Sequence, residues 1–435
     1  MKEIKTVTVV GANGTMGTNV SGIFASFGNA KVYMVSRDIK KSEAAAERAC
    51  RSVRADSIRN NLVPADYSML DECISSSDLV FESTAEKLDV KLEITKKIAA
   101  SMNAGAVACT GTSGLSITAL SECFPPDIRK NYFGMHLFNP PYSMTLCEFT
   151  PTKYTDRAVF EEIKLYLKDT LFRTVVEVKD SPAFLANRIG FQFINEAFQY
   201  ADRYKDNGGI DYIDAILGPF TGRVMAPLAT ADFVGLDVHK AIIDNLFENT
   251  NDYAHNTFVL PDYLKVLIDS GRLGRKTGIG VYKTEIQESG FKHRTVYDIE
   301  TGSYREIMNY VFPFAERIKA YLKIGEYEKA FAHLINNKSL EAAICLEFLL
   351  KYIVYSLNTT EYVGYDISSA DDVMAAGFNW CPPMAMIKAF SSVTDIEQLI
   401  RERTDRSVIE NVDLSSLLAK VKPSKYDYRP YFKSR

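Results

Sequence analysis

The chain of 435 residues lacks the features that would tie it to a membrane, a metal or nucleic acid. No apolar run approaches the roughly 20 residues that span a bilayer. The seven cysteines show no metal-ligand spacing, and an odd number in a long chain is typical of a reducing compartment. With 51 basic and 55 acidic residues, the net charge is −4, so the protein has no overall positive field that would attract polyanions. We therefore expect no metal site and no nucleic-acid or membrane partner.

A signal or transit peptide is not expected either, because an apolar strand pattern begins by residue 6 and leaves no room for one. With 46% hydrophobic residues the chain can bury large cores, and its length suggests two or three domains. These observations predict a folded, cytoplasmic protein.

What the sequence does contain begins with a strand, a glycine loop and a helix. The apolar run Lys5–Val10 precedes glycines at G-x-x-G-x-x-G spacing and a helical pattern with an apolar face of Val20, Ile23, Phe24 and Phe27. Such glycines let the backbone approach a pyrophosphate, and the helix N-terminus offers it unpaired N–H groups. The order predicts an α/β dinucleotide-binding domain of the Rossmann type. The residues expected to face the cofactor are Gly11, Asn13, Gly14, Thr15, Met16 and Gly17.

The end of the next strand bears on which dinucleotide is bound. An acidic residue normally binds the ribose 2′-hydroxyl directly after this strand, but Lys31–Val35 is followed by Ser36 and Arg37. Since a guanidinium pairs with a 2′-phosphate that a carboxylate would repel, the pattern leans toward NADP. Asp38 would restore a preference for NAD by turning inward. The alternative is that these residues form only a solvated turn with no role in the choice of cofactor. The expected cofactor is therefore NAD or NADP.

One of only five histidines lies in an unusual stretch near the middle of the chain. His136 stands between apolar residues, an Asn-Pro turn follows at Asn139, and Glu148 lies within the next apolar run. A carboxylate fixes the tautomer of a histidine and stabilises the imidazolium that forms when the ring takes a proton. The pattern favours a general base over the alternative, a core histidine whose nitrogens are satisfied by backbone.

Six motifs in order along the chain resemble the 3-hydroxyacyl-CoA dehydrogenase family, as far as about residue 285. They are the glycine loop, Glu86–Lys91, Thr112–Ser113, His136–Pro140 with Glu148, Asp180–Arg188 and Gly274–Lys283. Two departures stand out. The Thr112–Ser113 pair lies between Gly111 and Gly114, and Pro182 is followed by Ala183 where the family usually has glycine. Neither departure removes a group that the chemistry needs.

This resemblance implies an oxidoreductase that interconverts (3S)-3-hydroxyacyl-CoA and 3-oxoacyl-CoA with a nicotinamide cofactor. It implies His136 as the base and Glu148 as its orienting partner, with Ser113 and Asn187 as hydrogen-bond donors to the substrate oxygens. The residues that it places along the cofactor are Glu86, Lys91, Asn139 and Lys276. Neutral donors suit this reaction because they stabilise a developing alkoxide without adding a competing base.

The chain is expected to divide into three domains. Residues 1–179 show the α/β pattern, 180–285 form a helical domain, and 305–425 form a second, all-α domain that diverged from the first. The copy is inferred from Asp371–Gly377, which echoes Asp214–Gly218, and Gln287–Glu306 is expected to be a polar connection. Larger members of the family have such tandem domains, in which the second copy packs on the first as a dimer mate does. Hence we expect a monomer or homodimer.

Other interpretations stay open. A helix expected over Ser42–Asn60 carries arginines that would meet coenzyme A phosphates or are simply solvated. The same scaffold also suits a small non-CoA hydroxy acid, such as gulonate or carnitine. A non-catalytic nucleotide-binding protein is the third interpretation, and the intact Ser113, His136, Glu148 and Asn187 argue against it.

Overall fold

The computed structural model describes residues 3–287, 290 and 292–434 and divides into two compact units. The first holds the chain as far as Phe184 together with Val363–Tyr365, and the second holds Leu185–Tyr362 and the residues from Asp366 onward. None of the described helices is long and apolar enough to cross a membrane. Within the same residues, no three or more His, Cys, Asp and Glu side chains gather as a group that could hold a metal ion.

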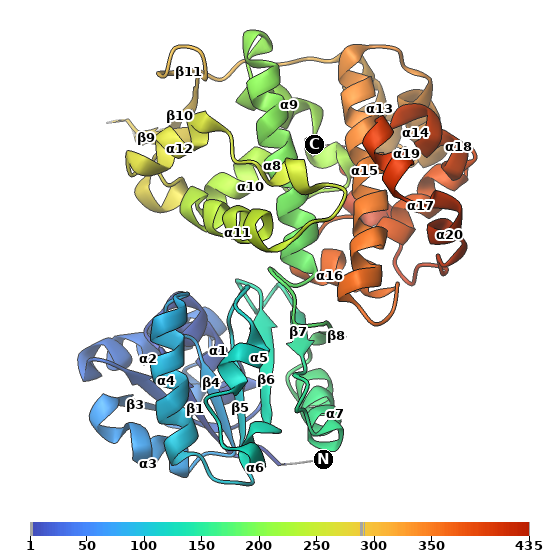
Figure 1. Cartoon of the computed structure of the whole chain (residues 1–435). Helices are drawn as coiled ribbons and strands as arrows, with labels where there is room; N and C mark the ends of the chain where they lie inside the picture. Colours follow the sequence, from blue (N-terminus) through green and yellow to red (C-terminus); the bar gives the residue numbers. More distant parts are fainter. Residues whose placement is uncertain (1–2, 288–289, 291, 435) are drawn as a thin grey trace. The chain divides into compact units, whose positions relative to one another are not determined.

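An eight-stranded sheet in the order β3-β2-β1-β4-β5-β6-β7-β8 forms the centre of the first unit (Figure 1). Pairing is parallel from β3 to β6, antiparallel between β6 and β7, and parallel between β7 and β8. Because the strand order reverses between β1 and β4, their carboxyl ends mark the switch point where doubly wound sheets bind ligands. The predicted Rossmann-type arrangement is confirmed. The strands are β1 (Thr6–Val10), β2 (Lys31–Ser36), β3 (Leu62–Asp66), β4 (Leu79–Glu82), β5 (Val107–Thr110), β6 (Tyr132–Leu137), β7 (Leu146–Thr150) and β8 (Thr174–Glu177).

Helices of the first unit pack on this sheet. Phe24 of α1, Ala49 of α2 and Phe160 of α7 lie in one apolar cluster with strand residues such as Val9 and Met135. Their burial supplies the core that holds the strand ends in place. The helices are α1 (Thr15–Ser26), α2 (Ile39–Val53), α3 (Leu70–Ser75), α4 (Leu88–Ser101), α5 (Ile117–Ser121), α6 (Pro126–Arg129) and α7 (Arg157–Leu165).

Two helix predictions were wrong at their C-terminal ends. The helix expected over Ser42–Asn60 ends at Val53, because Arg54 adopts a left-handed conformation (φ 57°) and its N–H bonds back to the last turn. The chain then turns so that Ile58 is buried before β3 begins. Phe27 lies one residue beyond α1 and is 42% exposed, so it is not part of the buried face of that helix.

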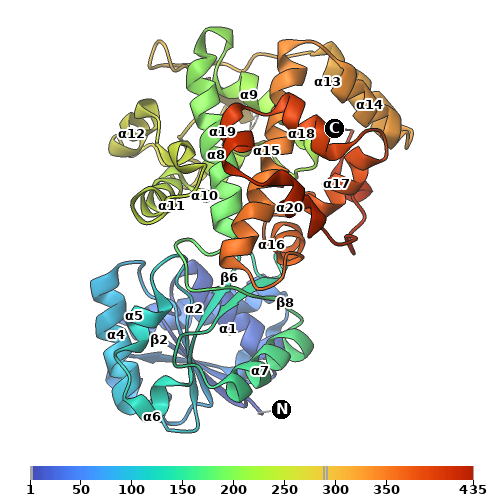
Figure 2. The same ribbon diagram turned by 45° about the vertical axis from the view of Figure 1, so that its right-hand side comes forward.

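The second unit is built around two long helices, α8 (Ala186–Arg203) and α15 (Leu340–Val363), which run side by side in both views (Figures 1 and 2). The ring of Phe193 on α8 lies 5.2 Å from that of Phe348 on α15 and 5.3 Å from that of Trp380. The sequence predicts one apolar helix face from the spacing of Ala186, Ile189, Gly190, Ile194 and Phe198, and in α8 this face is buried. The other helices are α9 (Ile210–Ile216), α10 (Pro227–Val234), α11 (Leu236–Asn249), α12 (Asp262–Asp269), α13 (Pro313–Lys323), α14 (Tyr327–Asn336), α16 (Ser369–Gly377), α17 (Pro383–Ser391), α18 (Ile396–Arg403), α19 (Arg406–Asn411) and α20 (Leu414–Ala419).

The prediction that Gln287–Glu306 is only a polar connection is wrong, because the stretch contains regular structure. It contains β10 (Lys292–Tyr297) and β11 (Tyr304–Glu306), which pair antiparallel as a sheet with β9 (Tyr282–Ile286). Polar and charged residues dominate its strands because one face stays open, while Val296 and Tyr297 are buried. Part of the expected connection (288–289 and 291) lies outside the described residues.

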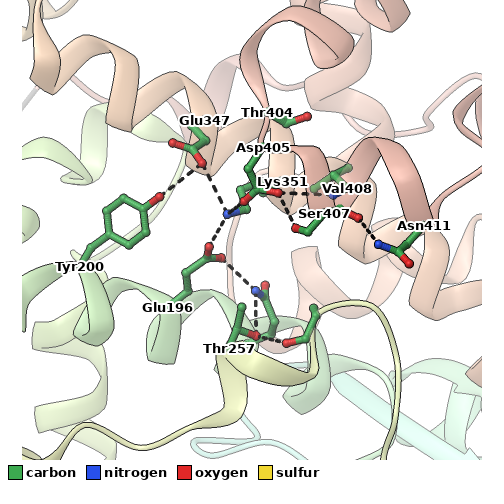
Figure 3. A network of polar contacts seen from close by, with 12 residues as sticks. Glu196, Tyr200, Thr257, Glu347, Lys351, Thr404, Asp405, Ser407, Val408 and Asn411 are labelled. Carbon is green, nitrogen blue, oxygen red and sulfur yellow. Dashed lines mark hydrogen bonds and ion pairs between the residues drawn. The ribbon is translucent and has the colours of Figure 1, made fainter. Parts of the chain in front are cut away.

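A buried polar network also joins α8 to α15 (Figure 3). The ammonium group of Lys351 contacts Glu196 of α8, Glu347 of its own helix at 3.5 Å and Asp405 at 2.7 Å. Lys351 is only 12% exposed, and the carboxylates around it raise its pKa although burial opposes the charge. The network therefore ties the region 180–285 to the region 305–425 within the second unit.

One capping contact occurs twice in the second unit. Asp214 of α9 accepts a hydrogen bond from the N–H of Leu228 at 2.8 Å, directly after the proline that begins α10. Asp371 of α16 accepts one from the N–H of Met384 at 2.8 Å, directly after the proline that begins α17. Burial raises the pKa of each carboxyl to about 6. The sequence echo thus corresponds to a repeated three-dimensional contact.

Candidate active site

His136 and Glu148 are brought together by the pairing of β6 with β7. The two residues are direct partners in the antiparallel register, which places their side chains on the same face of the sheet. Nδ1 of His136 lies 2.7 Å from Oε2 of Glu148. Both side chains are buried, with 5% and 0% exposure. The arrangement fixes the imidazole and leaves Nε2 as the nitrogen that can exchange a proton with a substrate.

Aromatic rings enclose the histidine. The ring of Phe138 stands edge-on at 4.6 Å, and that of Phe184 lies at 5.5 Å. Ala183, which stands where the family usually has glycine, adopts a left-handed backbone (φ 58°). A left-handed backbone costs a residue that has a Cβ roughly 1–2 kcal/mol, so alanine at this position is strained. An apolar surround of this kind excludes water and strengthens the charge interaction between imidazolium and carboxylate.

The glycine loop has the geometry of a phosphate cradle. Gly11 has a positive φ of 84°, and a Cβ there would lie 2.4 Å from the carbonyl oxygen of Ser83. A Cβ on Gly17 would lie 2.4 Å from the carbonyl oxygen of Gly11. Gly14 is the N-cap of α1, and Thr15 and Met16 occupy its first turn. Only a bare backbone fits this turn, so the loop suits a dinucleotide pyrophosphate against the helix N-terminus.

The structure places Ser36, the last residue of β2, and the two residues after it in different settings. The hydroxyl of Ser36 is buried, donates to the carbonyl oxygen of Asp38 at 2.9 Å and lies 2.8 Å from the hydroxyl of Ser42. The carboxylate of Asp38 caps α2 by accepting from the N–H of Lys40 at 2.9 Å. Arg37 is exposed. Of the two residues that lean toward NADP, Arg37 is therefore the one whose side chain can reach a ligand.

One of the arginines considered for coenzyme A contacts the glycine loop instead. Arg48 of α2 donates to the carbonyl oxygen of Asn13 at 3.0 Å and to the hydroxyl of Thr18 at 3.4 Å. Arg59 pairs with Glu47 and, at 3.7 Å, with Asp56. These two guanidinium groups are thus engaged within the first unit.

A polar group that sequence reasoning missed lies at the carboxyl end of β4. Glu82 is fully buried and pairs with Lys91 of α4 at 3.0 Å. Lys91 also lies 3.5 Å from Glu86, whose carboxylate accepts from the N–H of Ser113 at 2.8 Å and from the hydroxyl of Thr112. The structure thereby brings three predicted site residues together. The signal in the sequence was a carboxylate ending an apolar strand.

The remaining predicted site residues have other settings within their own units. Asn139 accepts a hydrogen bond from the side chain of Asn19 at 3.0 Å, which places it beside the N-terminal half of α1. Asn187, in the first turn of α8, and Lys276, paired with Asp237, belong to the second unit. Their contacts with a substrate or cofactor stay predictions.

Comparison with known proteins agrees with these features. The model of the 3-hydroxyacyl-CoA dehydrogenase NAD-binding domain matches residues 6–181, and that of the C-terminal domain of the same enzymes matches 184–284. A 3-hydroxybutyryl-CoA dehydrogenase of Bradyrhizobium diazoefficiens is 33% identical over 290 residues, covering 64% of this chain and 95% of its own. A probable 3-hydroxyacyl-CoA dehydrogenase of Bacillus subtilis is 26% identical over 409 residues, and the chain covers half of its length.

Among solved structures, a 3-hydroxybutyryl-CoA dehydrogenase of Escherichia coli K12 superposes with a TM-score of 0.68 at 20% identity. The match covers 98% of this chain and 97% of that one, so the similarity in fold extends through both helical regions. The family models together with the Bradyrhizobium relative establish the assignment: the chain belongs to the 3-hydroxyacyl-CoA dehydrogenase family.

Proposed function

We propose that the protein is a dehydrogenase that interconverts a (3S)-3-hydroxyacyl-CoA and its 3-oxoacyl-CoA with a nicotinamide cofactor. The observation that carries this proposal is the buried pair of His136 and Glu148, 2.7 Å apart, in the same unit as the glycine loop. The names of the Bradyrhizobium and Bacillus relatives support the acyl-CoA substrate.

In the proposed oxidation, Nε2 of His136 takes the proton of the substrate hydroxyl. The nicotinamide, when bound, supplies the hydride acceptor. Glu148 stabilises the imidazolium that forms and holds the ring in the tautomer that accepts at Nε2. Ser113 and Asn187 donate hydrogen bonds to the substrate oxygens and stabilise the developing alkoxide. In reduction, the imidazolium returns the proton to the carbonyl oxygen.

The cofactor is proposed to lie along the glycine loop from Gly11 to Gly17, with its remaining contacts from Glu86, Lys91, Asn139 and Lys276. We propose NAD or NADP as this cofactor, with a lean toward NADP because Arg37 is exposed directly after β2. The seven cysteines are all free, which is consistent with the proposed cytoplasmic location.

A substrate and cofactor panel tests the proposal. The purified full chain is assayed with acetoacetyl-CoA and with free gulonate and carnitine, each with both nicotinamide cofactors, and thermal shifts are recorded in parallel. We expect turnover of acetoacetyl-CoA at least a hundredfold above that of the free acids. Turnover of a free hydroxy acid alone would point to the small-substrate alternative. A cofactor-induced thermal shift without any turnover would point to a non-catalytic nucleotide-binding protein.

A further inference from the structure

The carboxylate of Glu82 is buried near the candidate site and contacts several partners. It is fully buried at the end of β4 and accepts hydrogen bonds from the N–H of Thr84 at 2.6 Å and from the hydroxyl of Thr110 at 2.6 Å. Lys91 lies 3.0 Å from both of its oxygens. Burial alone would raise the pKa of Glu82, but Lys91 and these hydrogen bonds hold it below the usual value. Glu82 therefore stays ionised in the fold.

The negative charge of Glu82 determines the position of the ammonium group of Lys91. Lys91 is 1% exposed, so its ammonium group has to remain beside a carboxylate. It now lies between Glu82 at 3.0 Å and the more exposed Glu86 at 3.5 Å. Without the negative charge of Glu82, the ammonium group would be balanced by Glu86 alone and would pull that carboxylate toward itself.

Glu86 in turn anchors the segment that carries Ser113. Its carboxylate accepts from the N–H of Ser113 at 2.8 Å and from the hydroxyl of Thr112. This segment lies between two glycines, and Gly111 has no space for a side chain because a Cβ would lie 2.7 Å from the ring of Phe81. Glycines restrict the backbone least. Glu86 thus holds the N–H of Ser113 itself, while the N–H of Thr112 before it bonds to the hydroxyl of Thr110 at 3.3 Å.

We propose that Glu82 is a positioning residue for the reaction, acting through Lys91 and Glu86 to place Ser113. The proposal rests on the proposed function, because it assumes that Ser113 binds a substrate oxygen. A small displacement of a group that aligns the reacting atoms costs up to about a hundredfold in rate. An ion pair that serves stability alone would leave the rate of the folded enzyme unchanged.

The test compares Glu82→Gln with wild type in the full chain. The amide keeps the shape of the side chain and an acceptor toward Thr110, but it removes the charge and turns an NH2 group toward the N–H of Thr84. We expect kcat with acetoacetyl-CoA to fall about ten- to hundredfold, with a smaller change in the KM for the acyl-CoA. Lys351→Met is the matched control, because it removes a buried ion pair of the second unit and should lower thermal stability at unchanged kcat.

The effect of combining Glu82→Gln with Lys91→Met shows whether Glu82 acts through Lys91. If Glu82 acts only through Lys91, the double variant Glu82→Gln with Lys91→Met should have the same kcat as Lys91→Met alone. Two independent losses that multiply would overturn the proposal, as would a Glu82→Gln enzyme with kcat within twofold of wild type. If Glu82→Gln does not fold, Thr84→Val removes a hydroxyl that donates to the same carboxylate from outside the segment that carries Ser113, and a kcat reduced threefold or more supports the proposal whereas an unchanged kcat overturns it.

Failure of the proposed function is separable from failure of this inference. If wild type turns over no acyl-CoA, the proposed function fails, and the dissociation constants of NADPH and NADH, read from nicotinamide fluorescence, then test the network with whichever of the two binds wild type more tightly. Weaker binding of that cofactor in Glu82→Gln, but not in Lys351→Met, would support the role of Glu82 in holding Glu86 and Lys91. Equal binding in wild type and both variants would overturn it.

Discussion

At the scale of single residues, two side chains carry the proposed chemistry and the choice of cofactor. His136 is held by Glu148 through the strand register and is enclosed by aromatic rings. Arg37 stands free of such constraints, exposed at the end of β2. A change at His136 should therefore affect kcat, and a change at Arg37 the KM for NADPH, much more than either change affects the fold.

Replacing the histidine tests its role as the base. We expect His136→Gln to lower kcat by about 10²–10⁴, the range typical of losing a general base. The dissociation constant of the nicotinamide cofactor should change little, because the glycine loop holds it. His255→Gln, in the second unit, is the control and should retain its activity. Near-normal steady-state turnover in His136→Gln would remove this residue from the mechanism.

Replacing the arginine tests the preference for NADP. If Arg37 pairs with a 2′-phosphate, Arg37→Ala should raise the KM for NADPH about ten- to hundredfold and leave the KM for NADH nearly unchanged. Arg48→Ala is the matched comparison, because Arg48 bonds to the glycine loop at Asn13 and should affect both cofactors alike. A wild-type enzyme that uses NADH far better than NADPH would refute the preference.

At the scale of elements, α8 is the helix on which the second unit depends, because it packs against α11 and α15 on different sides. His239 of α11 is fully buried beside it, with Nε2 3.0 Å from the side-chain oxygen of Asn195. Asn195 donates its own amide to the carbonyl oxygen of Val259, so the ring of His239 is the donor in their contact. Burial lowers the pKa of this ring to about 3, so the histidine is neutral in the fold near neutral pH.

This burial predicts a pH dependence of stability. Desolvation lowers the pKa of His239 from 6.5 to about 3, so the unfolded chain binds one more proton between these values. The contribution of the buried His239 to the free energy of unfolding is fully present above pH 6.5 and is lost as the pH falls toward 3. At pH 5 the loss is about 2 kcal/mol. The measurement is urea unfolding at pH 5 and pH 8, followed by the fluorescence of Trp380, for wild type and His239→Gln.

The difference between the two proteins isolates the histidine. Asp214, Asp232 and Asp371 have pKa values raised to about 6 by burial and act with the opposite sign, but they are common to both chains. The free energy of unfolding of His239→Gln should fall less between pH 8 and pH 5 than that of wild type. Parallel pH dependences would show that His239 does not titrate as its burial indicates.

The repeated cap is the strongest structural support for an internal duplication. Asp214 and Asp371 each join a short helix to the first turn of a following helix that begins with proline. We propose on this basis that residues 305–425 are a divergent copy of 180–285. Both regions lie in one compact unit because α8 and α15 share an apolar core.

At the scale of the whole molecule, this shared core bears on assembly. A second copy that is tethered to the first has an effective concentration in roughly the millimolar range and competes with a free partner. We therefore expect the full chain to be a monomer of 48.8 kDa. A chain cut after residue 285 should form dimers or aggregates, because it exposes the side of α8 that Phe348 covers.

Light scattering behind a sizing column checks both molecules at several concentrations. The full chain should keep one mass on dilution, and the mass of the shortened chain should rise with concentration. A full-length dimer together with a well-behaved monomeric short chain would show that the second helical region has another role.

The sequence by itself determined the order of strand, glycine loop and helix, the pairing of His136 with Glu148, and the apolar face of α8. Each of these depends on local pattern or on a nearby strand, so the information lies within a few tens of residues. The period of the apolar residues and the need for bare glycine backbone are visible without the fold.

The tertiary structure decided what depends on contacts between distant segments. The series of polar contacts from Glu82 through Lys91 and Glu86 to Ser113 joins residues from β4, α4 and the segment after β5. The inward hydroxyl of Ser36, the left-handed end of α2 and the sheet of β9–β11 likewise follow from neighbours that pack against them. A buried charge costs free energy unless a partner reaches it, and only the folded chain determines which partner does.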